Sequence, residues 1–336
     1  MIELFHINHR LEYVTNQIAE DCPYFFAKRE HYEKINKYVG KRGLVAEEDN
    51  INLELQLAKY SLEFMKQALL DCRRVNCSSE SNIRIEKYSI LFQYTTARSS
   101  YSAWMKDSQP LTPNEASKVY YFHGYSNNKV VVFDTFTAMK QGTQSASFTL
   151  PYSFAGTGHV VYWGNVYYRR LNTQNIIKYD PLKMKTIVKQ VNDVDAGNTC
   201  RYAWGGYTTT DFAVDEYGLW LVYGNRSNIC YLVIAKINPD TLDVEKSWET
   251  TIDIRGVGNT FMKCGVLYAT NSYNAQSNYI RYTYDTNTGK QESLSSSKIP
   301  FRQPGTSNAM LDYNPHDGLL YYSDRTYGYL ATFPIV

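Results

Sequence analysis

The sequence predicts a mainly β fold preceded by an α-helical segment, with the change near residue 80. The first part is rich in Glu, Lys, Leu and Asn and nearly free of Gly. Its apolar residues recur at three- and four-residue steps, the spacing of a helical seam. From about residue 86 this rhythm gives way to short apolar or alternating runs separated by turn residues. We therefore expect helices at 1–75 and a β domain at 76–336.

The helical part carries two apolar seams. The first is formed by Leu4, Ile7, Leu11, Val14 and Ile18, and it ends before Pro23, where a helix should break. The second keeps heptad spacing at Ile51, Leu55, Ala58, Leu62, Met65, Leu69 and Cys72. A further helix is expected from Ala27 to Tyr38. The heptads favour a coiled coil between chains, and hence a homo-oligomer, although a helix packed against its own chain gives the same pattern.

Six cysteines are spread along the chain: Cys22, Cys72, Cys77, Cys200, Cys230 and Cys264. None forms a Cys-x-x-Cys pair and no histidine stands at finger-like spacing, which argues against zinc and favours disulfides made in an oxidising compartment. Cys22 and Cys72 lie at the ends of the two seams. Each can bond to its counterpart in a parallel dimer, or the two can bond to each other and close a helical hairpin.

Two glycosylation sequons, at Asn76 and Asn225, also favour secretion. The first residues lack the pattern of a signal peptide, so we expect a mature or trimmed form of a secreted protein. No apolar run approaches the ~20 residues of a membrane span. A net charge of +2 gives no reason to expect nucleic acid.

The β part contains many short runs of strand type, such as Lys129 to Phe133 and Gly218 to Tyr223. Short antiparallel strands over about 250 residues imply a sandwich, a barrel or a propeller. A hydrophobic run that ends in Tyr, then Asp or Asn, then a small turn recurs, as at Ile177 to Pro181 and Tyr284 to Thr286. Such an echo is typical of propeller blades.

Ordered motifs make the resemblance specific. They are Ser102 to Asp107 (SAWMKD), Gly156 to Tyr162, Tyr202 to Tyr207 (YAWGGY), Asp211 to Trp220, Gly258 to Tyr268 and Met310 to Pro315. Over some 230 residues the chain resembles the olfactomedin domain family. The resemblance implies a five-bladed β-propeller, extracellular in nearly all members.

The resemblance also implies a central calcium site. By position, Asp211 and Asp312 match the family's two carboxylate ligands, Asn259 its carboxamide, and Thr260 and Leu311 its two backbone carbonyls. Such a mixed oxygen set suits Ca²⁺, and two buried carboxylates without a cation would repel each other. Members of the family often have Ala where Thr260 stands, a change that a carbonyl donor tolerates.

The cysteine pattern of the family fits in part. Cys264 matches the usual disulfide partner near the fourth blade, and Cys77 is the nearest candidate for its mate. Cys200 and Cys230 are not standard for the family, and we expect them to form a local bridge across the Trp204 to Tyr223 region.

These features predict a secreted, non-enzymatic, calcium-binding glycoprotein that binds extracellular or cell-surface proteins in adhesion or in matrix or mucus assembly. A carbohydrate-binding module is the alternative, encouraged by 31 tyrosines. A hydrolase that uses Asp211 and Asp312 as an acid/base pair is a third reading. We expect Asp215 and Glu216 to lie in a solvated turn and His159 to be structural.

Overall fold

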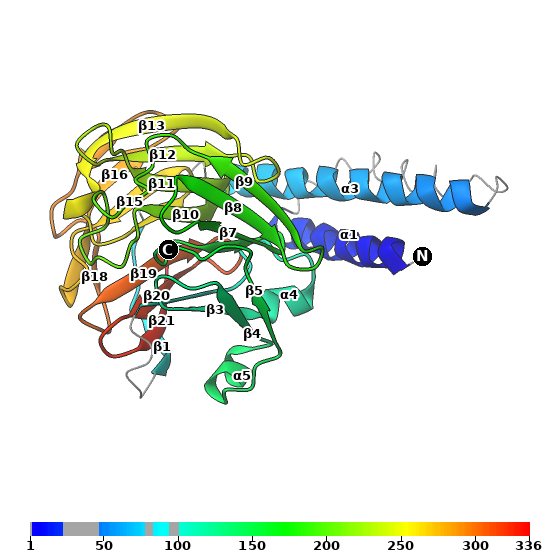
Figure 1. Cartoon of the computed structure of the whole chain (residues 1–336), viewed down its shortest axis with the longest axis horizontal. Coiled ribbons are helices and arrows are strands. Elements are labelled where there is room, and N and C mark those ends of the chain that lie inside the picture. Colours follow the sequence, from blue (N-terminus) through cyan, green and yellow to red (C-terminus); the bar gives the residue numbers. More distant parts are fainter. Residues whose placement is uncertain (1, 23–46, 78–82, 94–100) are drawn as a thin grey trace. The chain divides into compact units, whose positions relative to one another are not determined.

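The computed structural model describes residues 2–22, 47–77, 83–93 and 101–336. It divides into a helical unit, Met1–Glu80 with Leu111–Pro113, and a larger β unit, Ser81–Pro110 with Asn114–Val336 (Figure 1). The helix predicted from Ala27 to Tyr38 lies outside the described residues. No helix in the described part of the chain is long and apolar enough to cross a membrane.

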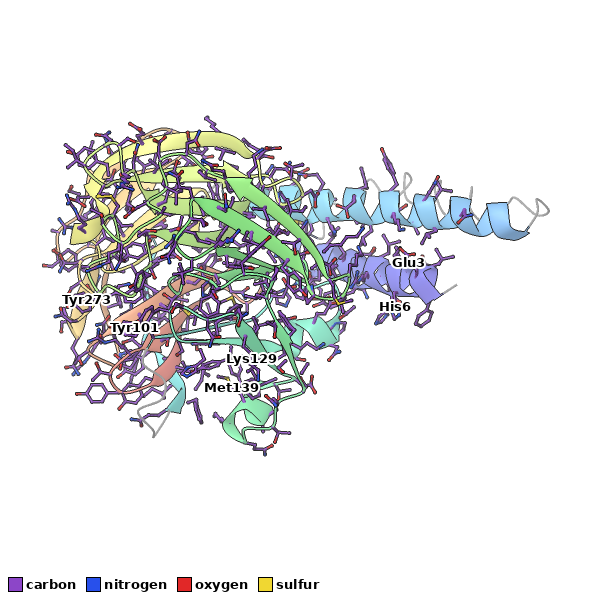
Figure 2. All side chains as sticks on the ribbon, in the orientation of Figure 1. Glu3, His6, Tyr101, Lys129, Met139 and Tyr273 are labelled. Carbon is purple, nitrogen blue, oxygen red and sulfur yellow. A yellow bond between two sulfur atoms is a disulfide. The ribbon has the colours of Figure 1, made fainter. Side chains whose placement is uncertain are left out.

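The helical unit consists of α1 (Ile2–Asp21) and α3 (Glu47–Asn76), which pack against each other. Most of the two predicted seams is buried, from Ile7 to Ile18 in α1 and from Ala58 to Cys72 in α3, whereas Leu4 and Leu55 are half-buried. Glu3, labelled in Figure 2, pairs with Lys59 at one end, and Asp21 pairs with Arg73 at the other. Because both residue numbers rise together, the two helices run parallel.

Cys22 and Cys72 are bonded to each other within one chain, at the C-terminal ends of the two helices. This corrects the inter-chain link that the seams suggested for these cysteines. The bond joins a parallel pair of helices rather than a hairpin. The physical reason for the difference is that α1 covers the apolar face of α3 which a second chain was expected to cover.

The β unit is a five-bladed propeller of antiparallel sheets (Figure 1). The first sheet contains β2 (Ser102–Met105), β3 (Val119–His123), β4 (Lys129–Phe133) and β5 (Ala146–Thr149). The second contains β6 (Val160–Tyr162), β7 (Asn165–Arg169), β8 (Asn175–Asp180) and β9 (Lys185–Gln190). The third contains β10 (Thr210–Asp215), β11 (Gly218–Gly224), β12 (Tyr231–Ile237) and β13 (Val244–Asp253).

The fourth sheet contains β14 (Thr260–Lys263), β15 (Val266–Thr270), β16 (Ser277–Asp285) and β17 (Gln291–Ser293), with β18 (Pro300–Arg302) also paired to β16. The fifth contains β19 (Asn308–Asn314), β20 (Leu319–Asp324), β21 (Tyr329–Pro334) and β1 (Ser89–Gln93). Three short helical segments lie between strands: α4 (Pro113–Ser117), α5 (Phe136–Lys140) and η4 (Ile254–Gly256).

The burial of each strand follows its place in the sheet. Every residue of β11 and β19 is buried, whereas every residue of the outer strand β9 is exposed. Apolar and aromatic side chains of neighbouring sheets fill the space between the ribbons (Figure 2). This is the arrangement expected when β-branched and aromatic residues pack on pleated surfaces.

Both ends of the β unit contribute to the fifth sheet. Strand β1 pairs antiparallel with β21, with Ser89 opposite Thr332. Beyond this ladder, Arg84 and Val336 exchange backbone hydrogen bonds of 2.7 and 3.0 Å. The blade is therefore completed by an early strand, which closes the ring.

The buried carboxylate of Asp107 connects the first and second blades. Asp107, just after β2, accepts from the backbone N–H groups of Trp163 (3.1 Å) and Gly164 (2.6 Å) in the second sheet. Burial, the main cause, raises the pKa of Asp107 to about 7, against the opposing effect of these hydrogen bonds. The motif residue thus links two blades rather than facing solvent.

The prediction of a solvated turn at Asp215 and Glu216 is wrong. Both residues are buried. Asp215 accepts from the Trp220 indole (2.6 Å) and from the backbone N–H of Gly265 (2.7 Å), and Glu216 accepts from the hydroxyl of Tyr313 (2.7 Å). Partners from the fourth and fifth sheets therefore satisfy this acid pair.

The remaining cysteines are also oxidised. Cys200 and Cys230 form the predicted local disulfide, with Cα atoms 5.0 Å apart. Cys77 and Cys264, the pair that the resemblance implies, are each disulfide-bonded, and no cysteine among the described residues is free.

Candidate metal centre

Three inner strands bring the predicted ligands into one region. Strands β10, β14 and β19 each begin a different sheet, and all three contact one another. Asp211 lies in β10, Asn259 and Thr260 at the start of β14, and Leu311 with Asp312 in β19. Residues about 50 and 100 positions apart in the chain therefore meet at the inner edges of three blades.

Asp211 is held by a tyrosine. The hydroxyl of Tyr202 donates to Oδ2 of Asp211 at 3.0 Å and lies 2.5 Å from Oγ1 of Thr260. One phenol thus connects two of the predicted ligand residues. Burial raises the pKa of Asp211 to about 7, although the hydrogen bond from Tyr202 opposes this shift.

Asp312 lies close enough to Asp211 for the two carboxylates to repel each other. Burial raises the pKa of Asp312 well above its ordinary value, and repulsion from the Asp211 carboxylate raises it further. Neither carboxylate has an ion pair with a basic side chain among the described residues. The region therefore holds a half-buried acid, Asp211, and a buried acid, Asp312, whose charges are not balanced by the described side chains.

Asn259 is buried, and its Nδ2 faces the backbone carbonyl of Asn308 at 3.5 Å. With the amide nitrogen turned toward an acceptor, Oδ1 is the atom that remains for a cation. An amide oxygen is a ligand that Ca²⁺ accepts readily.

The backbone of Thr260 is oriented by its ladder. The N–H of Thr270 in β15 donates to the carbonyl of Asn259 (2.9 Å), the residue just before β14, so the Asn259 carbonyl points toward β15. The next pair, Thr260 and Ala269, is then of the non-hydrogen-bonded kind, because the two kinds alternate. The Thr260 carbonyl consequently points away from β15, on the side where β10 and β19 lie.

Leu311 offers only its backbone, since its side chain is apolar and belongs to a buried cluster shared by the fourth and fifth sheets. It pairs with Tyr322 of β20, next to the pair of Asp312 with Tyr321. The support for Leu311 as a ligand is its position in β19, next to Asp312.

Two residues that the sequence reasoning did not select also shape the region. Tyr202 supplies the hydrogen bond described above, and Gly158 packs its backbone against Asp211. A methyl group at Gly158 would come within 2.6 Å of Oδ1 of Asp211 and 2.5 Å of the Thr210 carbonyl. Only glycine fits there, and both residues lie in motifs that carry the family resemblance.

The donor set fits a calcium ion. Two carboxylates, one carboxamide and the Thr260 carbonyl, which points away from β15, are hard oxygen donors. The two carboxylates supply two negative charges. A buried pair of like charges is unfavourable unless protons or a cation neutralise it. His159 brings no positive charge, because burial lowers its pKa to about 3. Its ring lies between Phe122 and Phe154, consistent with the structural role expected.

The structure does not suit a glycan at Asn225. Its side chain is only 7% exposed, and Nδ2 donates to Glu249 at 3.3 Å. A sugar attached to that nitrogen would have to displace this part-buried contact, and glycosylation at Asn225 stays a prediction. The side chain of Asn76 lies outside the described ones.

Comparison with known proteins identifies the family of the β unit. A family model, the olfactomedin-like domain, matches residues 73–335. Myocilin of the cat, Felis catus, is 34% identical over 234 residues, which covers 68% of this chain and 47% of the cat protein. The chain thus spans about half the length of this curated relative.

Solved structures add only weak likenesses. Glutaminyl cyclase of Myxococcus xanthus has a TM-score of 0.45 at 9% identity, covering 76% of this chain and 98% of that one. An auxiliary nutrient binding protein of Bacteroides thetaiotaomicron has a TM-score of 0.39 at 10% identity, covering 66% of this chain and 57% of that one. Neither likeness bears on function. By the match of its β unit, the chain belongs to the olfactomedin-like domain family.

Proposed function

We propose that this protein is a secreted, non-enzymatic scaffold whose propeller binds one calcium ion and presents loops to extracellular or cell-surface proteins, in adhesion or in matrix or mucus assembly. The observation that carries the proposal is the convergence of two carboxylates, the half-buried Asp211 and the buried Asp312, on inner strands of different blades. The disulfides support an oxidising compartment.

In this proposal the calcium ligands keep the inner strands of the propeller in place. Asp211, Asn259 and Asp312 hold three inner strands at fixed distances, Tyr202 orients one carboxylate, and Gly158 leaves room for it. A bound calcium ion supplies the positive charge that lets both carboxylates stay ionised in a buried place. The blades then resist separation, and the loops at their ends keep a fixed arrangement.

A hydrolase would need Asp211 and Asp312 as its acid/base pair. Their use as ligands leaves no such pair free, which is why we propose a binding protein. The alternative of a carbohydrate-binding module is favoured by a separate feature, a polar cleft lined by β13 and β16.

We propose further that the helical unit joins copies of the chain. The heptad seam of α3 is covered by α1. A different apolar stripe of α3, at helical spacing, is exposed: Leu57 (39% exposed), Tyr60 (76%) and Phe64 (54%). An exposed stripe of this kind marks an interaction surface. A second copy offers the same stripe, and linked propellers bind repeated targets more tightly through effective concentration.

This assembly is tested by sedimentation of the reduced and the oxidised protein. We expect a dimer or larger species for the native chain and a monomer for the double variant Y60E/F64E. The matched control is Gln56→Glu, an exposed position off the stripe. A native chain that sediments as a monomer at all concentrations would remove the proposal.

The calcium proposal is tested by thermal unfolding with calcium or with a chelator. At a calcium concentration of about 100 times Kd, binding stabilises the folded state by about 2.7 kcal/mol. For a domain of this size that raises Tm by roughly 5–10 °C. Equal Tm values in calcium and in chelator would contradict the proposal.

A further inference from the structure

A polar cleft lies between the third and fourth blades. Its volume is about 420 Å³, and residues of β13, η4, β16 and β17 line it. Strands β13 and β16 are labelled in Figure 1. Ligand pockets in proteins commonly measure ~300–1,000 Å³. None of the five predicted calcium ligands lines this cleft.

A fixed guanidinium is the main feature of the cleft. Nη1 of Arg281, on β16, donates to the carbonyl of Gly256 at 2.9 Å, which anchors one side of the group. Nε and Nη2 of Arg281 have no hydrogen-bond partner in the parts of the chain that the structure describes. An anchored guanidinium with a free edge is suited to a planar anion, above all a carboxylate.

The cleft is net positive despite the acid in its wall. Asp253 also lines it, but Nε of Arg255 contacts both carboxylate oxygens (3.0 and 2.9 Å) and Nη2 contacts one of them (2.5 Å). The charge of Asp253 is therefore balanced locally. The charge of Arg281 remains, so the cleft favours a ligand with one negative group.

The rest of the lining is polar and partly aromatic. Thr251, Asn271 and Ser293 offer hydroxyl and amide groups, and Tyr279 offers a half-buried ring. Hydroxyl-rich ligands pair with such groups, and the face of an aromatic ring packs against the apolar face of a sugar.

We propose that this cleft binds an acidic sugar, a uronic or sialic acid residue, with its carboxylate on Arg281 and its ring against Tyr279. A secreted protein meets acidic sugars in extracellular glycans. This choice of ligand therefore rests on the proposed function, whereas the geometry of the cleft is independent of it. The site makes the protein a weak lectin in addition to a calcium scaffold.

The test uses methyl β-D-glucuronide and, as a matched neutral ligand, methyl β-D-glucoside, which lacks only the carboxylate. Binding to the full chain is measured by calorimetry and by saturation-transfer NMR. We expect Kd for the glucuronide to be at least tenfold lower than for the glucoside. Arg281→Gln should abolish this preference, and Arg281→Lys should weaken it severalfold because an ammonium group lacks the planar fork.

Arg302→Gln is the control variant, because Arg302 is an exposed arginine that does not line the cleft. It should bind the glucuronide as the native chain does. The thermal stability and calcium response of each variant are measured in parallel, so that loss of folding or of calcium binding is seen separately from loss of sugar binding.

Three results would overturn the proposal: equal binding of the two sugars, undiminished binding by Arg281→Gln, or no binding of the glucuronide. Tighter binding of N-acetylaspartate methylamide would assign the cleft to acidic peptides instead. A calcium response without sugar binding refutes only this inference. Sugar binding without a calcium response refutes only the calcium scaffold.

Discussion

The hydroxyl of Tyr202 donates a hydrogen bond of 3.0 Å to Oδ2 of Asp211, and the same oxygen lies 2.5 Å from Oγ1 of Thr260. Tyr202 thereby couples the third and fourth blades at the place where the calcium ligands are predicted. Its own pKa is raised well above the ordinary value by burial and by the nearby Asp211, so it stays a donor.

Substituting Tyr202→Phe should weaken the propeller even without calcium. The change leaves the half-buried Asp211 carboxylate and the buried Thr260 hydroxyl short of a partner, at a cost of about 1–3 kcal/mol. Urea unfolding in chelator measures this free energy. Tyr327→Phe, at an exposed tyrosine, is the control and should change stability by less than about 0.5 kcal/mol. Equal stability of the two variants would show that the Tyr202 contact is unimportant.

Gly158→Ala should lower both stability and calcium affinity. The added methyl group meets Asp211 and the Thr210 backbone at distances where one of them must move. Gly256→Ala is the control, since the nearest atom to its added methyl group is 3.7 Å away. Circular dichroism melts and calcium titrations compare the two. A Gly158→Ala protein that binds calcium normally would mean that Asp211 is not held as described.

In chelator, stability should fall as the pH rises from about 4 to about 7. Asp107 and Asp211 each have a pKa raised to about 7, mainly by burial, so the folded chain binds their protons more tightly than the unfolded chain does. The favourable contribution is complete below the unfolded pKa and is lost as the pH passes the folded one. Thermal melts at several pH values follow this change.

Asp107→Asn should flatten that pH profile, and added calcium should reverse the part due to Asp211. Calcium binds the ionised carboxylate, so its affinity should rise over the same pH window. A profile in chelator that rises from pH 4 to 7 would contradict the assignment of raised pKa values.

The disulfide between Cys22 and Cys72 should appear within single chains. Mass spectrometry of a non-reduced digest should find these two peptides linked, and a non-reducing gel should show no covalent dimer. Cys22→Ser alone should then leave Cys72 free to react with a thiol reagent. A dimer band that disappears on reduction would restore the inter-chain link that the sequence suggested.

The inner strands and the family fold could be predicted from the sequence because their motifs combine strand-forming residues with glycine turns in a fixed order. The seams of α1 and α3 could also be predicted, but a heptad pattern shows only that a helix has an apolar face. It does not show whether the covering helix belongs to the same chain or which way it runs.

Contacts between distant residues were the part that could not be predicted. Asp215 and Glu216 look like a solvated acidic turn in sequence, and their burial depends on donors about 50 and 100 residues further along, such as Gly265 and Tyr313. The burial of Asn225 depends in the same way on the packing around it. Local pattern carries no information about such partners.

Calcium stoichiometry is the most direct test of the central claim. After removal of free metal, elemental analysis should find about one calcium per native chain and about one for Asp134→Asn, an exposed aspartate used as control. Asp211→Asn and Asp312→Asn should each retain essentially none, because each removes one of the two charges that balance the ion. Calcium retained by both of these variants, or absent from the native chain, would contradict the account.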